Sequence, residues 1–200
     1  MHVPPDPPTP RPGMIATEPP PPEIVATDSR IAYENPWMRV REDRIRRADG
    51  SPGLYGVVEK RDFAVVVPLH ADGQRLHLVQ QFRYPVGQRL WEFPQGMSDP
   101  GDPDLLACAG RELREETGLE AARLELAGHL FLAAGLSTQG YAVVLATGLT
   151  AGTATPETEE QGLVARDFAL AEVEAMLREG AIRDATTLAA FGLLRLQGRL

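Results

Sequence analysis

The sequence has 200 residues, of which 43% are hydrophobic, and its formal net charge is −8. This composition predicts one globular domain with a sizeable core, and an acidic surface argues against nucleic-acid binding because it repels phosphates. The single cysteine, Cys108, cannot form an internal disulfide. No apolar run approaches the roughly 18 residues of a membrane-spanning helix, so we expect a cytoplasmic protein with no membrane partner.

Proline dominates the first 22 residues, which hold ten of the 18 prolines. Because proline lacks a backbone N–H and fixes φ, this segment cannot form a regular helix or a central strand. We therefore predict a flexible tail over residues 1–28 and one folded domain over residues 29–200. A proline-rich docking segment is the alternative reading of the tail.

The first half of the folded domain carries strand patterns. Residues 40–46 are typical of a polar, exposed strand, and residues 54–59 and 63–69 are rich in β-branched side chains. Residues 76–82 alternate apolar and polar positions. Asp72-Gly73 between the last two segments is a strong hairpin signal. These patterns predict a sheet made mostly of antiparallel hairpins.

A helix with clear end signals follows. Asp102 suits the N-cap, Pro103 suits the first helical position and Gly118 suits the C-terminal stop. After this helix the patterns predict a different order of elements. The predicted strands are 124–132, 141–147 and 164–168, and the predicted helices are 170–178 and 184–196. This order indicates an α/β or α+β sandwich.

The helix that ends at Gly118 places carboxylates beside its own apolar stripe. With Leu105 at zero and about 100 degrees per residue, Glu112 lies near 340 degrees and Glu116 near 20 degrees, next to the apolar residues. Solvated charges normally lie opposite that stripe, and like charges at i,i+4 repel. Since carboxylate oxygens are the ligands that Mg²⁺ prefers, the spacing favours a metal site. An ordinary charged face with an Arg111–Glu115 pair is the alternative.

The same segment carries a motif. Gly96 followed by residues 111–119, Arg-Glu-Leu-Arg-Glu-Glu-Thr-Gly-Leu, resembles the box of the Nudix hydrolases. That box reads Gly, five residues, Glu, seven residues, then Arg-Glu-aliphatic-x-Glu-Glu-x-Gly-aliphatic. The second half matches at every specified position. In the first half, Gly96 precedes Arg111 by one residue more than usual, and Asp102 stands where the family has its first Glu.

The resemblance implies an α/β (α+β) domain of the Nudix fold, a mixed β-sheet sandwiched between α-helices. It also implies hydrolysis of a nucleoside diphosphate linked to another group, so that the partner is a small-molecule nucleotide. In the family's terms, Arg111 would orient a glutamate. The implied ligands of Mg²⁺, or of Mn²⁺, are Glu112, Glu115, Glu116 and the carbonyl of Gly96.

The flanking segments narrow the resemblance to ADP-ribose and nucleotide-sugar pyrophosphatases. Residues 81–85, Gln-Phe-Arg-Tyr-Pro, and residues 91–96, Trp-Glu-Phe-Pro-Gln-Gly, resemble the segment before their box, and residues 180–188 resemble the start of their final helix. In that subgroup the early strands usually cross a dimer interface. The resemblance therefore implies a homodimer, with the strand at 40–46 as the candidate contact.

Three residues outside the box are candidates for substrate binding. Arg83 offers a planar fork to phosphate oxygens, with a surface salt bridge as the alternative. Glu92 would contact the substrate or the metal shell, or else pair with Arg83 or Arg111. Gln139 stands where many ADP-ribose enzymes carry a glutamate near the substrate, a departure from the subgroup's pattern.

The resemblance places the catalytic base on a loop after the box. Glu159 is the first candidate and Glu160 the second, with a solvated acidic loop as the alternative, and Glu115 is the candidate on the box helix itself. Two other functions stay open, a nucleoside triphosphate pyrophosphohydrolase and a non-catalytic nucleotide-binding sensor.

The remaining thiol and imidazole groups suggest structural roles. Cys108 lies near the apolar face of the helix and should be a packed residue. His70, His77 and His129 look isolated in or beside strands.

Overall fold

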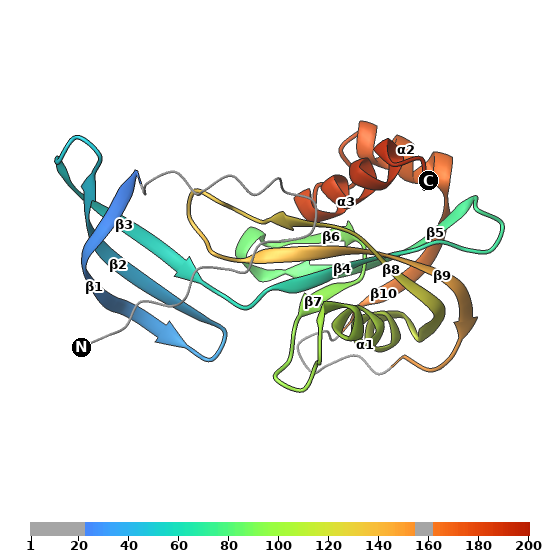
Figure 1. The fold of residues 1–200 in the computed structure, drawn as a ribbon. Coiled ribbons are helices and arrows are strands. Elements are labelled where there is room, and N and C mark those ends of the chain that lie inside the picture. The colour runs from blue at the N-terminus through green and yellow to red at the C-terminus, as the bar shows by residue number, and fades with distance from the viewer. Residues whose placement is uncertain (1–22, 155–161) are drawn as a thin grey trace.

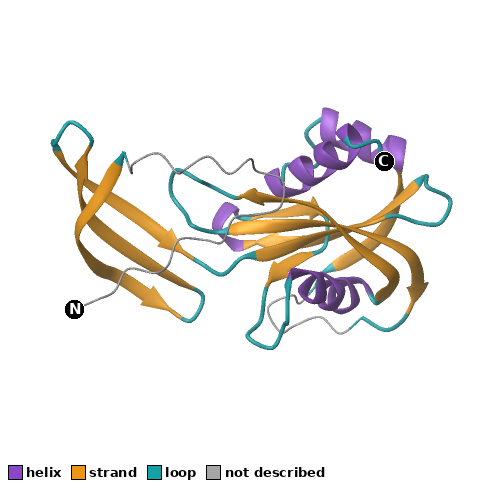
Figure 2. Ribbon diagram, viewed as in Figure 1, coloured by secondary structure: helices purple, strands orange, loops and turns teal. Residues whose placement is uncertain are grey.

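The computed structural model describes residues 23–154 and 162–200 of the chain. Within them the chain forms three sheets and three α-helices. Figures 1 and 2 show α1 on one side of the central strands and α2 and α3 on the other, with a separate sheet of β1–β3 projecting from this body. The predicted layers, a mixed sheet between helices, are confirmed.

The projecting sheet is the N-terminal one. It has the order β1-β2-β3, and both pairs of strands are antiparallel. Strand β1 begins at Ile24, within the predicted tail of residues 1–28, and Ile24 pairs with Arg47 at the far end of β2. Residues 1–22 of the expected tail lie outside the described residues. The strands are β1 (Ile24–Asn35), β2 (Met38–Arg47) and β3 (Pro52–Glu59).

Two further sheets build the body. One has the order β7-β4-β9-β8 and the other the order β10-β5-β6, and within them only β4 and β9 run parallel. The strands of the first sheet are β4 (Phe63–Pro68), β7 (Gln95–Met97), β8 (Leu119–Phe131) and β9 (Gly140–Ala151). Those of the second are β5 (Arg75–Arg83), β6 (Gln88–Glu92) and β10 (Val164–Ala169), with the short helix η1 (Tyr84–Val86) between β5 and β6.

The hairpin predicted around Asp72-Gly73 is wrong beyond its turn. The turn forms, since the backbone N–H of Gly73 donates to the carbonyl of His70 at 2.9 Å. However, the flanking strands meet only at the bridge between Leu69 and Leu76 and then enter different sheets. The reason is that both edges of β4 are occupied, one by β7 and the other by β9, so β5 has no edge of β4 to pair with.

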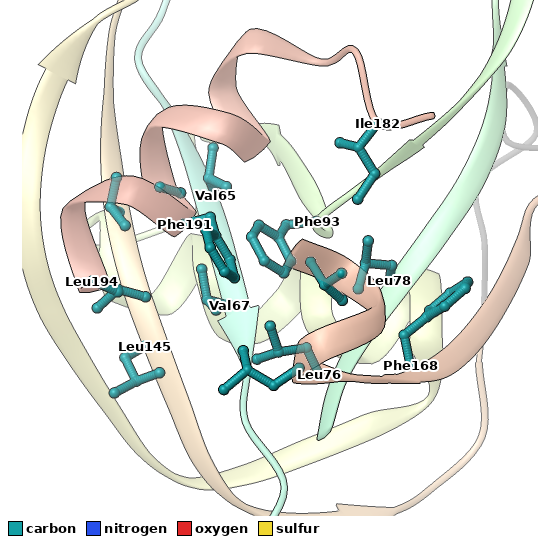
Figure 3. Packing of buried hydrophobic residues seen from close by; sticks show 14 of the residues in the cluster. Val65, Val67, Leu76, Leu78, Phe93, Leu145, Phe168, Ile182, Phe191 and Leu194 are labelled. Atoms are coloured by element: carbon teal, nitrogen blue, oxygen red, sulfur yellow. The ribbon is translucent and has the colours of Figure 1, made fainter. Parts of the chain in front are cut away.

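Two apolar clusters lie on opposite faces of β4 and β9. Val65 and Val67 of β4 pack in one cluster with Leu76, Phe93 and, from α3, Leu194, as Figure 3 shows. Alternate residues of the same strands face α1. This second cluster comprises Ala64, Val66, Cys108, Ala109, Leu113, Ala142, Val144 and Ala146. The uninterrupted apolar run at 63–69 therefore reflects burial on both faces.

The helices are α1 (Leu105–Thr117), α2 (Leu170–Arg178) and α3 (Ala185–Leu196). Gly118 ends α1 with φ 70°, which confirms the predicted stop. The predicted N-cap is wrong, because the carboxylate of Asp104 accepts hydrogen bonds from the N–H groups of Leu106 and Ala107. Asp102 and Pro103 precede the helix, and Asp102 has another partner, described below.

Candidate active site

The glutamates of α1 occupy the phase that the sequence predicts. Glu112 and Glu116 are 5% and 2% exposed and lie beside the buried Leu113, against the sheet. Glu115 is half-buried at the edge of this row. Two carboxylates at the inner face of a helix are costly to bury unless a cation or donors compensate them.

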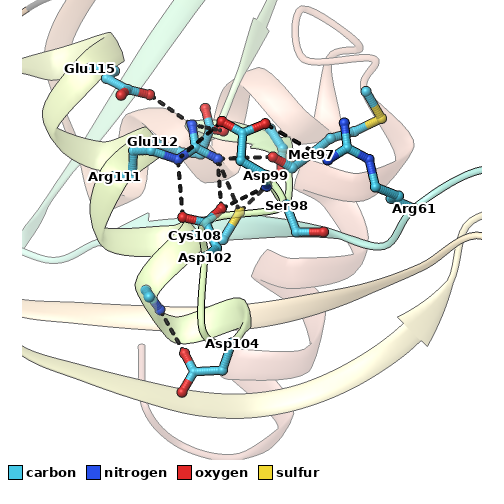
Figure 4. A network of polar contacts seen from close by, with 12 residues as sticks. Arg61, Met97, Ser98, Asp99, Asp102, Asp104, Cys108, Arg111, Glu112 and Glu115 are labelled. Atoms are coloured by element: carbon cyan, nitrogen blue, oxygen red, sulfur yellow. Dashed lines mark hydrogen bonds and ion pairs between the residues drawn. The ribbon is translucent and has the colours of Figure 1, made fainter. Parts of the chain in front are cut away.

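Arg111 is the centre of the polar network around these carboxylates (Figure 4). Its guanidinium lies 2.8 Å from Glu112 Oε1 and 2.8 Å from Glu115 Oε2, and it donates to the Met97 carbonyl at 2.9 Å. It also donates to both carboxylate oxygens of Asp102, at 3.0 and 3.3 Å. Asp102 is therefore the carboxylate partner of Arg111, which explains why it does not cap the helix.

These contacts shift the pKa values of the network. The Arg111 hydrogen bond holds the pKa of the Asp102 carboxyl below its usual range. Burial works to lower the pKa of Arg111, but its hydrogen bonds and the surrounding carboxylates raise it well above its ordinary value. Burial, reinforced by the nearby Glu112 charge, raises the pKa of the Cys108 thiol to about 12, so this residue is a packed thiol and not a nucleophile.

Gly96 lies on β7 against the carboxylate of Glu112. A Cβ atom added at Gly96 would collide with all three atoms of that carboxylate group. The next residue along α1 on this face, Glu116, accepts a hydrogen bond from the Gln95 N–H at 3.2 Å. Strand β7 thus contacts two glutamates of α1. Gly96 leaves room for the carboxylate of Glu112, and the backbone N–H of Gln95 donates to Glu116. The donor set offers oxygen atoms only, which fits a hard divalent cation such as Mg²⁺ or Mn²⁺.

Arg83 and Glu92 form an ion pair in the second sheet. The guanidinium of Arg83 donates to both carboxylate oxygens of Glu92, at 2.6 to 3.2 Å. Glu92 is 1% exposed, whereas the side chain of Arg83 is 37% exposed. Burial works to lower the pKa of Arg83, but its hydrogen bond to Glu92 and the Glu92 charge raise it. Glu92 therefore pairs with Arg83, one of the two partners expected for it in a structural role. Part of the Arg83 side chain remains exposed to solvent.

Gln95 connects the start of α3 to the Arg83–Glu92 pair. The side chain of Asp184 accepts from the Thr187 N–H at 2.8 Å and lies 3.3 Å from Nε2 of Gln95. Gln95 also donates from Nε2 to Glu92, and its Oε1 lies 2.6 Å from the hydroxyl of Thr186. The segment at 180–188, known from sequence only by its resemblance, therefore docks α3 onto the corner between β6 and β7.

One cavity of about 880 Å³ is lined both by Arg111 and Glu112 of α1 and by Arg83 of the second sheet. Of the predicted site residues, Arg83, Gln139, Gly96 and Glu112 line it, whereas Glu92, Glu115 and Glu116 do not. Sequence reasoning missed several other lining residues. These are Trp37, Lys60, Arg61, Tyr84, Asp184 and Thr186. A basic pair directly before a buried strand was the available signal for Lys60 and Arg61.

Gln139 lines the cavity but its amide is engaged. Its Nε2 donates to the carbonyl of Arg61 at 2.7 Å, and its own N–H donates to Ser137 Oγ at 3.1 Å. Gln139 is 2% exposed, so it shapes the wall next to Arg61. The two base candidates, Glu159 and Glu160, lie outside the described residues.

Comparison with known proteins agrees with this geometry. The NUDIX domain family matches residues 60–191, and the family described as nucleoside diphosphate sugar hydrolase N-terminal domain matches residues 26–58. An ADP-ribose pyrophosphatase of Mycobacterium tuberculosis is 34% identical over 80% of this chain and 78% of its own length. A methanol dehydrogenase activator of Bacillus methanolicus is 28% identical over 82% of this chain and 88% of its own.

A solved structure shares the fold. The crystal structure of an ADP compounds hydrolase superimposes with a TM-score of 0.76, covering 90% of this chain and 98% of that one, at 20% sequence identity. The chain therefore belongs to the Nudix hydrolase family, and it is an enzyme that hydrolyses a nucleoside diphosphate linked to another group. Among residues 23–154 and 162–200, no helix is both long enough and apolar enough to cross a membrane.

Proposed function

We propose that the substrate is ADP-ribose or a nucleotide sugar, cut to a nucleoside monophosphate and a sugar phosphate in the presence of Mg²⁺, with Mn²⁺ as a substitute. The cavity of about 880 Å³ carries this proposal, because it joins an acidic wall at Glu112 to a basic wall at Lys60, Arg61 and Arg83. Its size suits a dinucleotide-sized ligand. The M. tuberculosis relative, an ADP-ribose pyrophosphatase, supports the same substrate class.

The residues have separate tasks in this proposal. Glu112, Glu115, Glu116 and the Gly96 carbonyl would hold the cation, which supplies Lewis acidity to the phosphates and a more acidic bound water. Arg83, aligned by Glu92, binds a phosphate through its accessible face. Arg111 sets the orientation of Glu112 and Glu115 and offsets their repulsion. Glu159, or else Glu160, would take the proton of the attacking water, and Glu115 is the third candidate.

The basic wall resolves a difficulty posed by the chain's charge. A chain with net charge −8 repels an anionic diphosphate at long range. Lys60, Arg61 and Arg83 line the same cavity, so positive charges are available there to contact the phosphates. Trp37 and Tyr84 add aromatic surface on which a base or sugar can pack.

We further propose a cytoplasmic homodimer that forms through the N-terminal sheet. Val25, Tyr33 and Leu54 share one face, because they lie opposite the alternate residues Arg46, Val40 and Arg44 of β2. All three apolar side chains are about half exposed or more. On this face the exposed apolar side chains lie among charged ones such as Arg44 and Arg46, a mixture that supports its use as an interaction surface.

A substrate panel with product identification tests the function. With Mg²⁺, ADP-ribose should give AMP and ribose 5-phosphate, whereas release of pyrophosphate from triphosphates would identify a triphosphate pyrophosphohydrolase instead. Glu116→Gln and Glu112→Gln should each lower kcat by more than about 100-fold while the fold is kept, because they remove charge from the cation site. Glu120→Gln, an exposed glutamate on β8, is the matched control and should keep full activity. Tight nucleotide binding without metal-dependent turnover of any diphosphate would reject the catalytic proposal.

A further inference from the structure

Two histidines and an aspartate meet at the second sheet, away from the residues that line the cavity. Asp167 of β10 lies directly opposite His77 of β5, and His70 begins the turn that leads into β5. Oδ1 of Asp167 lies 2.7 Å from Nε2 of His70 and 2.5 Å from Nδ1 of His77. The sequence suggested that His70 and His77 are isolated, and this prediction is wrong because both contact Asp167.

We propose that His70 Nε2, His77 Nδ1 and a carboxylate oxygen of Asp167 form a binding site for a transition-metal dication such as Zn²⁺. The three ligand atoms lie within 4.8 Å of one another, and no other group of three His, Cys, Asp or Glu ligands in the described part of the chain meets that criterion. Ligands at about 2.0–2.2 Å from one Zn²⁺ lie roughly 3–4 Å apart. The side chains therefore need to move by about 1 Å or less.

The ring nitrogens of the two histidines converge on one carboxylate oxygen. Nδ1 of His77 faces Oδ1 of Asp167, whereas its other nitrogen, Nε2, is buried and makes no hydrogen bond to any described residue. A metal bound between these ligand atoms would displace the protons through which the rings contact Asp167.

Neighbouring charges hold the carboxylate in place. Arg75 contacts the second oxygen of Asp167, Oδ2, at 3.2 Å and leaves Oδ1 facing the two rings. Nε of Arg75 donates to Asp72 at 2.8 Å, so a second acidic group compensates the guanidinium. Asp167 is the most exposed of the three ligands, and water can reach the fourth coordination position from its side.

The ligand types separate this site from the one on α1. Imidazole nitrogen favours Zn²⁺, Ni²⁺ and Cu²⁺, whereas an all-oxygen set favours Mg²⁺ or Mn²⁺. A bound ion here would join the turn after β4, strand β5 and strand β10. This is where α2 begins, since the Leu170 N–H donates to the Gln74 carbonyl at 2.7 Å. The expected result of binding is a more stable body and not a new chemical step.

Metal titration of the chelator-stripped full-length chain tests the site. In excess Mg²⁺, which saturates the carboxylates of α1, calorimetry should show uptake of one equivalent of Zn²⁺, and the Tm should rise. Asp167→Asn should weaken Zn²⁺ binding by more than about 10-fold and abolish the rise in Tm. His129→Gln is the matched control, because His129 also faces one aspartate, Asp62 at 2.9 Å, but is not part of a three-ligand group. Its Zn²⁺ affinity should equal that of the wild type.

A gain of signal keeps the test decisive if Asp167→Asn does not fold. His70→Cys retains a ligand at a turn position and should add a thiolate-to-metal charge-transfer band when Co²⁺ is bound. The wild type should lack that band, because its single cysteine, Cys108, is buried with a pKa raised to about 12. Absence of Zn²⁺ uptake by the wild type in excess Mg²⁺, wild-type affinity in Asp167→Asn, or no new band in His70→Cys would each overturn the proposal.

Discussion

The body of the molecule and its N-terminal sheet differ in how much of their strands' surface is buried. In the body, β4 is covered on both faces by the two apolar clusters, one under α1 and one under α2 and α3. In the N-terminal sheet, β1 is exposed along almost its whole length. The body thus contains both apolar clusters, whereas most side chains of β1 face solvent.

The N-terminal sheet nevertheless reaches the active site. The N–H of Val58 in β3 donates to the Leu136 carbonyl at 2.9 Å, and the hydroxyl of Tyr55 donates to the Gly135 carbonyl at 3.1 Å. Trp37, in the turn between β1 and β2, lines the cavity. The body therefore holds the proposed metal ligands, and the N-terminal sheet contributes Trp37 to the cavity and carries the proposed surface for association.

The largest expected effect separates the two regions by stability. Leu194→Ala removes a fully buried side chain of α3 and should lower the free energy of unfolding by about 2–5 kcal/mol. Leu54→Ala, on the N-terminal sheet at 61% exposure, should change it by less than about 0.5 kcal/mol in dilute protein, where monomers prevail. Urea unfolding followed by circular dichroism measures both. Equal losses would mean that the N-terminal sheet is packed as firmly as the body.

The common face of the glutamates that form the proposed metal half could be predicted from the sequence because it is local. Glu112 and Glu116 lie on one helix, so the helical repeat alone gives their common face and their place beside Leu113. The C-terminal stop at Gly118 is equally local. The N-cap was misplaced by two residues, because the choice between Asp102 and Asp104 depends on Arg111, which takes the carboxylate of Asp102 through tertiary contact.

The proposed substrate half could be predicted only in part, at Arg83 and Gln139, because the rest of it is built from distant segments. Trp37, Arg83 and Asp184 reach one cavity from the N-terminal sheet, the second sheet and α3. Their meeting depends on β4 and β5 entering different sheets, which a turn signal at Asp72-Gly73 does not reveal. A pattern of local hydrophobicity gives the strands but not their pairing partners.

The second largest expected effect is on kcat, and it is measured by substituting two glycines separately. Gly96→Ala places a methyl group in the carboxylate of Glu112 and should displace that ligand, which lowers kcat by roughly 100-fold. Gly56→Ala in β3 is the matched control, because an added Cβ there meets nothing within 4 Å, and it should keep wild-type kcat. Steady-state assays across a range of Mg²⁺ concentrations measure both variants. Unchanged kcat and Mg²⁺ dependence in Gly96→Ala would show that Glu112 does not need its observed position.

The smallest expected effect concerns association through the N-terminal sheet. Leu54→Glu puts a charge on the face that Leu54 shares with Val25 and Tyr33, and should weaken the proposed dimer by about 10-fold or more, because the carboxylate would have to be buried there. Leu188→Glu, at 56% exposure on α3 of the body, is the control and should dimerise like the wild type. Sedimentation equilibrium over a range of concentrations measures the dissociation constant of each. A wild-type chain that stays monomeric throughout would rule out the dimer. If Leu54→Glu dimerises normally while Leu188→Glu does not, the association surface lies on the body. The proposal that the N-terminal sheet forms the dimer contact would then be wrong.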